Sequence, residues 1–110
     1  MKRLRFIGAS KEDLSRFPEW ARSRAGHELF MVQCGRDPAN WKPMQTVGAG
    51  VREIRVLDVS GAYRVIYVAK FADAVYVLHA FAKKTQQTSN LDLELAKQRY
   101  RQAQLLVREV

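Results

Sequence analysis

Apolar residues recur every three to four positions through the first third of the chain, which is the spacing of one face of an amphipathic helix. The members of this stripe are Leu14, Phe17, Ala21, Ala25, Leu29 and Val32. Pro18 interrupts the stripe. Because proline lacks a backbone N–H and disfavours helix at the preceding residue, we expect two helices, with Pro18 near the start of the second. Ser10 is placed to cap the first helix, and Gly35 to end the second.

The middle of the chain changes from helical spacing to runs rich in valine, isoleucine and tyrosine. Three such runs predict strands, over residues 51–57, 62–69 and 73–81. The short segments DVSG and KFAD separate them, as in a β-meander. Residues 4–8 predict a further short strand. Residues 37–50 contain proline and glycine without a steady period and predict a connector.

The last part of the chain returns to helical spacing, and either Thr88 or Ser89 is expected to cap this helix. Its apolar face consists of Leu93, Ala96, Tyr100, Ala103 and Val107. The order of elements predicts a single α+β domain over residues 1–110, built on a small antiparallel sheet. We expect the N-terminal helices to pack on one face of that sheet and to leave the other face open.

The net charge of the chain indicates a class of binding partner. Nineteen Lys and Arg residues against eleven Asp and Glu residues give a formal net charge of +8. Such an excess attracts polyanions, so nucleic acid is the first partner to consider. Cys34 is the only cysteine, which excludes an intrachain disulfide and fits a reduced compartment. No apolar segment has the length of a signal peptide core or a membrane span, so we expect a cytoplasmic protein without a membrane partner.

Arginines in the middle of two predicted strands are the first candidates for chemistry. Alternation along the strands places Arg64 on one face of its strand, and Glu53 and Arg55 on the face opposite Arg52. A charged side chain in mid-strand needs an open face or a partner. Two interpretations stay open. One is a cross-strand ion-pair network of Glu53, Arg55 and Arg64 on a solvated face; the other is a phosphate-binding face.

Lys83 and Lys84 follow the last predicted strand, where the sheet holds the backbone while the side chains reach water. They are either a solvated strand end or a pair of anchored cations. His79 alternates with apolar residues and predicts a satisfied, half-buried histidine. The histidines and the single cysteine lack zinc-ligand spacing, and no phosphate-binding glycine loop is present. The sequence thus predicts neither a metal nor a cofactor.

Five short segments resemble, in the same order, motifs of the RelE/HigB-type toxins of bacterial toxin–antitoxin modules, in the branch first described from phages. LFMVQCGRDP is similar to L-x-x-x-Q-x-G, GAGVREIRV to G-x-G-x-x-E-x-R, and GAYRVIYV to Y-R-x-x-Y. VLHAFAKKTQQT is similar to L-H-x-F-x-K-K-T-x-x-T, and LELAKQR to A-x-x-R. Ser89 stands where members often have proline, and both residues suit a helix start.

The resemblance implies a RelE-like α+β toxin that cleaves messenger RNA, in many members on the ribosome, and is neutralised by a cognate helix-turn-helix antitoxin. DNA is then contacted only through the antitoxin. The resemblance also assigns Arg64 to the scissile phosphate, and Lys83 and Lys84 to transition-state charge or proton transfer. Glu53 either orients Arg64 or accepts a proton. Further candidates for RNA or ribosome contacts are Arg52, Arg55 and Lys42.

Metal-independent cleavage of this kind is chemically feasible because the RNA 2′-hydroxyl can attack its own adjacent phosphate when fixed cations stabilise the added charge. A lysine acting as acid or base needs a lowered pKa, which neighbouring cations can produce. The alternative is a non-catalytic basic module that binds RNA, the ribosome or an antitoxin. A DNA-binding domain is a third interpretation, although the last helix commits its regular stripe to a core.

Overall fold

The computed structural model of the protein describes residues 1–84 and 87–108. The helices are α1 (Ser10–Ser15), α2 (Glu19–Gln33) and α3 (Asn90–Arg108). The strands are β1 (Arg3–Phe6), β2 (Trp41–Pro43), β3 (Val51–Asp58), β4 (Gly61–Val68) and β5 (Ala74–Ala82). The predicted α+β class is confirmed, as are both N-terminal helices, the three-strand meander and the final helix.

The strands of the described chain form one sheet in the order β1-β5-β4-β3-β2. The meander β3, β4 and β5 is antiparallel, as predicted. However, β1 runs parallel to β5, so the sheet is mixed and not wholly antiparallel. The two helices between β1 and the meander return the chain to the same end of the sheet, which a hairpin does not do. The predicted connector also contains the short edge strand β2, whose three residues are too few to show a period.

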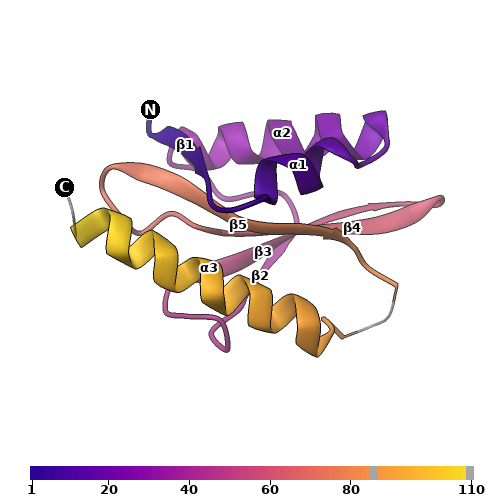
Figure 1. The fold of residues 1–110 in the computed structure, drawn as a ribbon. Helices are drawn as coiled ribbons and strands as arrows, with labels where there is room; N and C mark the ends of the chain where they lie inside the picture. The colour runs from indigo at the N-terminus through magenta and orange to yellow at the C-terminus, as the bar shows by residue number, and fades with distance from the viewer. Residues whose placement is uncertain (85–86, 109–110) are drawn as a thin grey trace.

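One layer of the core lies between the sheet and the N-terminal helices, which Figure 1 shows on one side of the strands. Every residue of the predicted helical stripe is buried there against β3, β4 and β5. Trp20 packs at the margin of this layer, with its ring 5.7 Å from that of Tyr63. The stripe therefore lies where helical spacing predicted.

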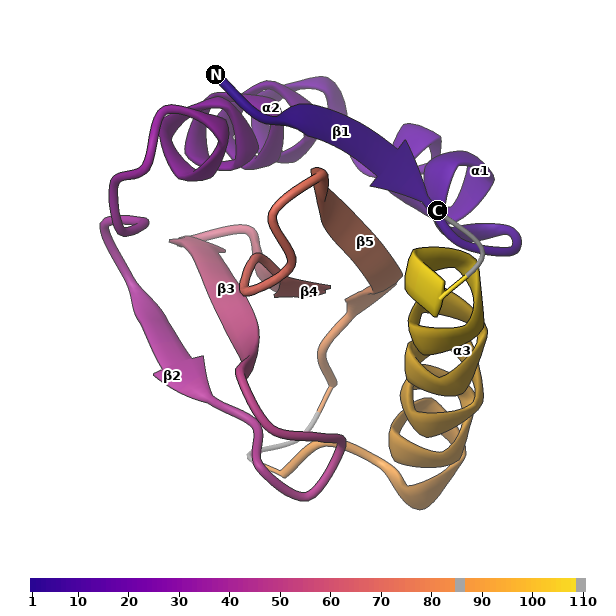
Figure 2. The ribbon, with the colours of Figure 1, turned by 90° about the vertical axis from the view of Figure 1, so that its left-hand side faces the viewer.

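A second layer forms on the other face of the sheet, so the prediction of an open face is wrong. The helix α3 lies across part of that face (Figures 1 and 2). Ala96, Tyr100 and Ala103 pack there with Ile66 and Leu78. The face is covered because the strands present apolar residues on both sides, and these bury only if a second helix covers them. Only part of the face remains for polar side chains, at the β2–β3–β4 side.

The helix ends agree with the sequence in part. Gly35 follows α2 with φ +84°, a left-handed conformation that glycine adopts without strain. Ser10 is not the cap of α1, because that position belongs to Ala9 and no side-chain cap forms. The Ser10 hydroxyl instead donates to the carbonyl of Val77, 3.1 Å away. This buried bond ties α1 to β5.

A β-bulge at Leu78 changes the direction of the side chains in the second half of β5. Ile66 pairs with His79 and Tyr67 with Val77, which leaves Leu78 as the extra residue. His79 and Phe81 therefore face α3, although simple alternation groups them with Val77 on the other face. The predicted buried and satisfied histidine is confirmed, since His79 is 5% exposed and bonded to Asp92.

Gly48 gives a test of the second layer. A Cβ added there would lie 2.3 Å from Cε2 of the buried Tyr100 ring. We expect Gly48→Ala to lower the free energy of unfolding by about 1–3 kcal/mol, because the ring has to move within a packed layer. Urea denaturation measures the change.

Gly26 provides the control, because it is exposed on α2 and nothing lies within 4 Å of an added Cβ. Gly26→Ala should raise the free energy of unfolding by about 0.5–1 kcal/mol. Equal effects of the two alanines would contradict the packing of Tyr100 against Gly48.

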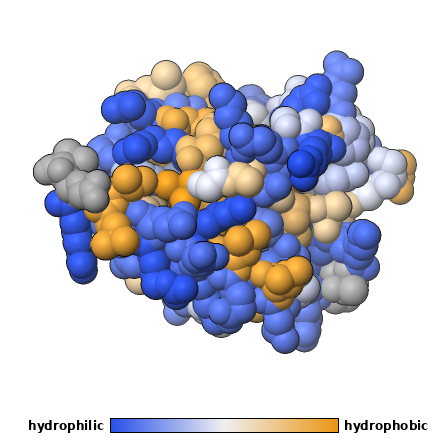
Figure 3. All heavy atoms as spheres, viewed as in Figure 1, coloured by the Kyte–Doolittle hydropathy of each residue, from blue (hydrophilic) through white to orange (hydrophobic). Residues whose placement is uncertain are grey.

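None of the helices within residues 1–84 and 87–108 has the length and apolar character that crossing a bilayer requires. In Figure 3 the hydrophilic colour covers most of the visible surface and is broken by separate apolar areas. The large apolar residues with the highest exposure are Met1, Phe30, Leu57, Val59, Leu91 and Leu105.

Candidate functional site

A buried ion pair lies between the two central strands, on the face that α3 partly covers. Glu53 of β3 has no exposed surface, and Arg64 of β4 is 5% exposed. The Arg64 Nε atom lies 3.3 Å from a carboxylate oxygen of Glu53. Burial lowers the pKa of Arg64, while the charge of Glu53 opposes this shift. The predicted cross-strand ion pair is thus confirmed, but the solvated face is wrong for both partners.

Two further predicted residues join this pair. Lys42 of β2 pairs with Glu53 across the sheet, and its Nζ atom lies 3.9 Å from the carboxylate. Arg55 pairs with Arg64, and its positive charge lowers the pKa of Arg64 further. Glu53 is therefore one carboxylate among several cations, which we call the cation cluster: Lys42, Glu53, Arg55, Arg64 and Lys83.

Lys83 completes the cluster at the exit of β5. Its backbone N–H donates to the carbonyl of Ala62, 2.8 Å away, which holds it beside β4. Burial is the main cause that lowers the pKa of Lys83. Glu53 opposes the shift, whereas Arg64 and the other cations of the cluster add to it. Burial thus contributes more to the lowered pKa of Lys83 than the neighbouring cations do.

A cavity of about 280 Å³ adjoins the cluster. Its lining consists of Phe81, Ala82, Lys83, Lys84, Gln87, Ser89 and Asp92. Lys84 is exposed at this cavity, so both lysines of the predicted pair border one hollow. Arg64 is not part of the lining and lies behind it, next to Glu53. The cavity can therefore receive an anion at the exposed ammonium of Lys84, next to Lys83, whose Nζ atom is buried without a hydrogen-bond partner among the described residues.

Arg52 does not belong to the cation cluster. Its strand neighbours Glu53 and Arg55 face α3, whereas Arg52 faces the other side, as alternation predicted. There its guanidinium donates to Asp37, 2.8 Å away, and lies 3.9 Å from the centre of the Trp41 ring. Any contact of Arg52 with RNA is thus separate from the cluster.

Thr88 belongs to the candidate site, although its sequence pattern indicated only a helix cap. Its hydroxyl donates to the second carboxylate oxygen of Glu53, 3.1 Å away. The segment between β5 and α3 therefore contributes a hydrogen bond to the buried carboxylate. The signal was the second threonine of the T-x-x-T pattern, which suggested only a helix cap. Ser89 takes that role, since its hydroxyl accepts the backbone N–H of Asp92 at 3.1 Å. The first threonine of the pattern, Thr85, lies outside the described residues.

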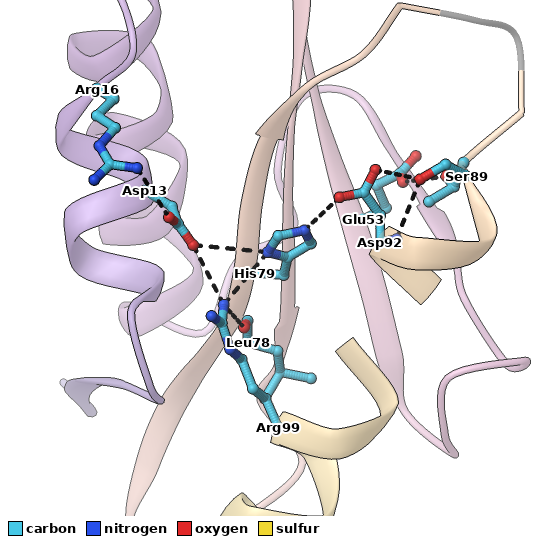
Figure 4. Close-up of polar contacts among 9 residues, drawn as sticks. Asp13, Arg16, Glu53, Leu78, His79, Ser89, Asp92 and Arg99 are labelled. Atoms are coloured by element: carbon cyan, nitrogen blue, oxygen red, sulfur yellow. Dashed lines mark hydrogen bonds and ion pairs between the residues drawn. The ribbon is translucent and has the colours of Figure 1, made fainter. Parts of the chain in front are cut away.

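A polar network next to the site was also missed. Figure 4 shows the His79 ring between Asp92 of α3 on one side and Asp13 of α1 with Arg99 on the other. Arg99 donates to the carbonyl of Leu78 at 3.0 Å and lies 3.3 Å from Nδ1 of His79.

The network joins three elements. Arg99, which can only donate, lies 3.3 Å from Nδ1 of His79, and Nε2 of the same ring lies 2.7 Å from Asp92. The network thereby connects α1, β5 and α3 directly behind the cavity. Both ring nitrogens of His79 have partners within the protein.

Among the described residues, no group of three or more His, Cys, Asp or Glu side chains is arranged to hold a metal ion. The ionic groups that do gather are mostly cations. Such a cluster can bind and polarise a phosphate group, and the lowered pKa of Lys83 lets it exchange a proton closer to neutral pH.

Comparison with known proteins places the chain in a family. Residues 12–101 match the family model described as Phage derived protein Gp49-like (DUF891). A search of curated proteins found no match. The phage-derived branch expected from the motifs is thus confirmed, whereas the wider RelE/HigB relationship stays a prediction. Because the match covers most of the chain, the protein belongs to the phage-derived Gp49-like family, a toxin-like family of toxin–antitoxin modules.

Proposed function

We propose that the protein is the toxin of a type II toxin–antitoxin module and acts as a metal-independent endoribonuclease on messenger RNA, on the ribosome. A RelE/HigB-type relationship, a cytoplasmic location and a helix-turn-helix antitoxin are parts of the same proposal. The observation that carries it is the cation cluster, in which Lys83 combines a lowered pKa with a place in the lining of a cavity. A phosphodiester bound there lies beside both an acid–base group and fixed positive charge.

The proposed reaction is attack of the 2′-hydroxyl on the adjacent phosphorus. The neutral amine of Lys83 takes the hydroxyl proton as the O2′–P bond forms. The P–O5′ bond then breaks, and the leaving oxygen takes a proton from the ammonium of Lys84. The products are a 2′,3′-cyclic phosphate and a 5′-hydroxyl. Arg64 and Arg55 stabilise the extra negative charge of the transition state.

Glu53 has a positioning role in this scheme. Its carboxylate has no exposed surface, accepts from Thr88 and is paired with Arg64, so both of its oxygens already have partners within the protein. Of the two roles implied by the family resemblance, orientation of Arg64 fits this geometry better than proton transfer. Arg52 stays outside the reaction because it lies on the other face of β3.

The burial of Arg64 favours a second candidate function. At 5% exposure and in an ion pair, its guanidinium does not present its donors to solvent as a phosphate-binding arginine usually does. A non-catalytic basic module that binds RNA, the ribosome or an antitoxin needs no such exposure. The two candidates differ in one result, which is whether the purified protein breaks RNA.

The test is cleavage of an end-labelled messenger RNA by purified protein, with and without ribosomes, in the presence of EDTA. We expect cleavage that leaves cyclic phosphate ends. Lys84→Gln should lower the rate by about 10–100-fold, because one exposed cation at the reacting phosphate is lost. Lys11→Gln removes the same charge from the exposed side of α1 and should leave the rate unchanged.

Binding of RNA or ribosomes without cleavage under any of these conditions would exclude the ribonuclease and support the binding module. Equal rates for Lys84→Gln and the wild type would instead remove Lys84 from the site. The partner is tested separately: co-expression with a small helix-turn-helix protein encoded beside the gene should yield a stable complex without RNA cleavage.

A further inference from the structure

A second cavity, of about 330 Å³, lies where the end of α2 approaches the beginning of β3 and the end of β4. The charged side chains in its lining are Lys2, Arg36, Arg52, Lys70 and Asp37. Four cationic residues and one acidic residue therefore line the cavity. None of these residues belongs to the cation cluster around Glu53, and Arg52 lies on the opposite face of β3 from it.

Tyr67 contributes a buried hydroxyl to this cavity. The residue is 1% exposed and lines the cavity from β4. The Tyr67 hydroxyl lies close to Arg52. Within residues 1–84 and 87–108, however, this hydroxyl has no hydrogen-bond partner. Burial raises the pKa of Tyr67, so the hydroxyl stays protonated and can donate. An unpaired buried donor is costly unless a ligand or water accepts from it.

Arg52 is held in a fixed orientation at the same cavity. Its Nη1 atom donates to Asp37, and its plane rests on the Trp41 ring at 3.9 Å. A guanidinium has five N–H donors, so one bond to a carboxylate leaves others for a further acceptor. The stacking also limits the side-chain entropy that a new ligand has to remove. The charge and the donor are thus preorganised.

We propose that this cavity binds a phosphate group, with Arg52 and the Tyr67 hydroxyl as its direct donors and with Lys2, Arg36 and Lys70 as surrounding charge. Phosphate suits the site because it offers several acceptor oxygens and a negative charge to a planar guanidinium fork. The volume leaves room for a phosphate with a small attached group. The group comes either from a free nucleotide or from a nucleic-acid backbone.

Asp37 limits the site to ligands that leave its ion pair with Arg52 intact. It is 67% exposed at its side chain, so it stays hydrated beside a bound anion. The charge of Glu28 also acts on Tyr67, but its carboxylate already accepts the backbone N–H of Ala39 at 2.7 Å. The local balance of charge at the cavity therefore remains positive.

The experiment is titration of the 110-residue protein, followed by NMR, with inorganic phosphate, a nucleoside 5′-monophosphate and a short single-stranded deoxyoligonucleotide without terminal phosphates. We expect shifts centred on Arg52 and Tyr67 with at least one of these probes. Tighter binding of the monophosphate identifies a nucleotide source, and tighter binding of the oligonucleotide identifies a backbone. Because these probes lack a cleavable linkage, the result does not depend on the ribonuclease proposal.

Variants make the assignment specific. Tyr67→Phe should weaken binding about tenfold, and Arg52→Gln by about 10–100-fold, in line with loss of one hydrogen bond to a charged ligand. Without phosphate, Tyr67→Phe should melt about 4 °C higher than the wild type, because it removes an unpaired buried hydroxyl. That shift also shows that the variant folds. Arg101→Gln, an exposed charge loss on α3, is the control and should bind as the wild type does.

Two results would overturn the proposal. One is the absence of shifts at the cavity with all three probes at millimolar concentration. The other is equal affinity of wild type, Tyr67→Phe and Arg52→Gln, which would mean that binding reflects net charge and not these donors.

Discussion

Replacing Lys83 by methionine is expected to lower the rate of RNA cleavage by about 10³-fold, while the protein becomes more stable. The loss of rate follows from the removal of the proposed acid–base group, since general acid–base catalysis contributes about 10²–10⁴-fold in enzymes. Methionine keeps the length and apolar character of the lysine stem. Single-turnover cleavage of labelled RNA measures the rate.

The pH profile separates acid–base catalysis from simple charge. Burial and the neighbouring cations lower the pKa of Lys83 below its ordinary 10.5. If its neutral amine is the base, the wild-type rate rises about tenfold per pH unit below that lowered pKa and levels off above it. The Lys83→Met variant should lack this rise. A wild-type rate that falls with increasing pH would contradict the role as base.

The stability effect has the opposite sign to the activity effect. Between the lowered pKa and 10.5, the unfolded chain binds more protons than the folded one, so stability rises with pH in this window. Below the window, the cost of holding the charged amine in a buried place is fully present. Lys83→Met removes that cost and should add about 1 kcal/mol at neutral pH, with a smaller gain at higher pH.

Two controls accompany Lys83→Met. An RNA with a 2′-deoxyribose at the cleavage position should resist the wild type as strongly as normal RNA resists the variant. Retained cleavage of the deoxy substrate would exclude attack by the 2′-hydroxyl. An unchanged or lower free energy of unfolding in Lys83→Met would show that the lysine is not buried at a cost.

Replacing Glu53 by alanine is expected to lower the free energy of unfolding by about 3–5 kcal/mol, which is a large share of the stability of a domain of this size. The variant leaves Arg64, at 5% exposure, without its partner at 3.3 Å and beside Arg55 and Lys42. Unpaired buried charge is among the most destabilising changes known in proteins. Urea denaturation with a constant m-value measures the loss.

A double variant distinguishes the ion pair from packing. Glu53→Met combined with Arg64→Met removes both charges and should recover most of the lost stability, because a buried pair gives little net stabilisation over apolar side chains of similar size. Glu94→Ala, which removes an exposed acid from α3, should change the free energy of unfolding by less than about 0.5 kcal/mol. A double variant as unstable as Glu53→Ala would show that the loss is a packing effect.

The sequence predicted those parts of the fold that depend on local periodicity. The stripe from Leu14 to Val32 and the face from Ala96 to Ala103 are buried as their spacing indicates. The failures involve partners distant in sequence. Nothing local to residues 3–6 specifies pairing with β5, and three residues of β2 cannot show a period. Cover of the second face depends on where α3 docks.

The predictions for the candidate site also succeeded where they depended on local alternation and failed where they depended on distant contacts. Strand parity correctly separated Arg52 from Glu53, because alternation in β3 has no interruption. Parity failed in β5, where the bulge at Leu78 turns His79 to the other face. The bond from Thr88 to Glu53 was not predictable, since the two residues are 35 positions apart along the chain. The burial of Arg64 was not predictable either, because it depends on what covers the strand. Alternation predicts the face of the sheet to which each side chain of a strand points, but not which other segments cover that face.

The parallel pairing of β1 with β5 has a consequence for synthesis on the ribosome. Ser10 and Val77, which bond between α1 and β5, are 67 residues apart, and β1 finds its partner over a similar separation. Pairings of such high contact order form late. Translation must therefore extend past β5 before this edge can close. A nascent chain that has not reached Lys83 lacks the assembled cation cluster.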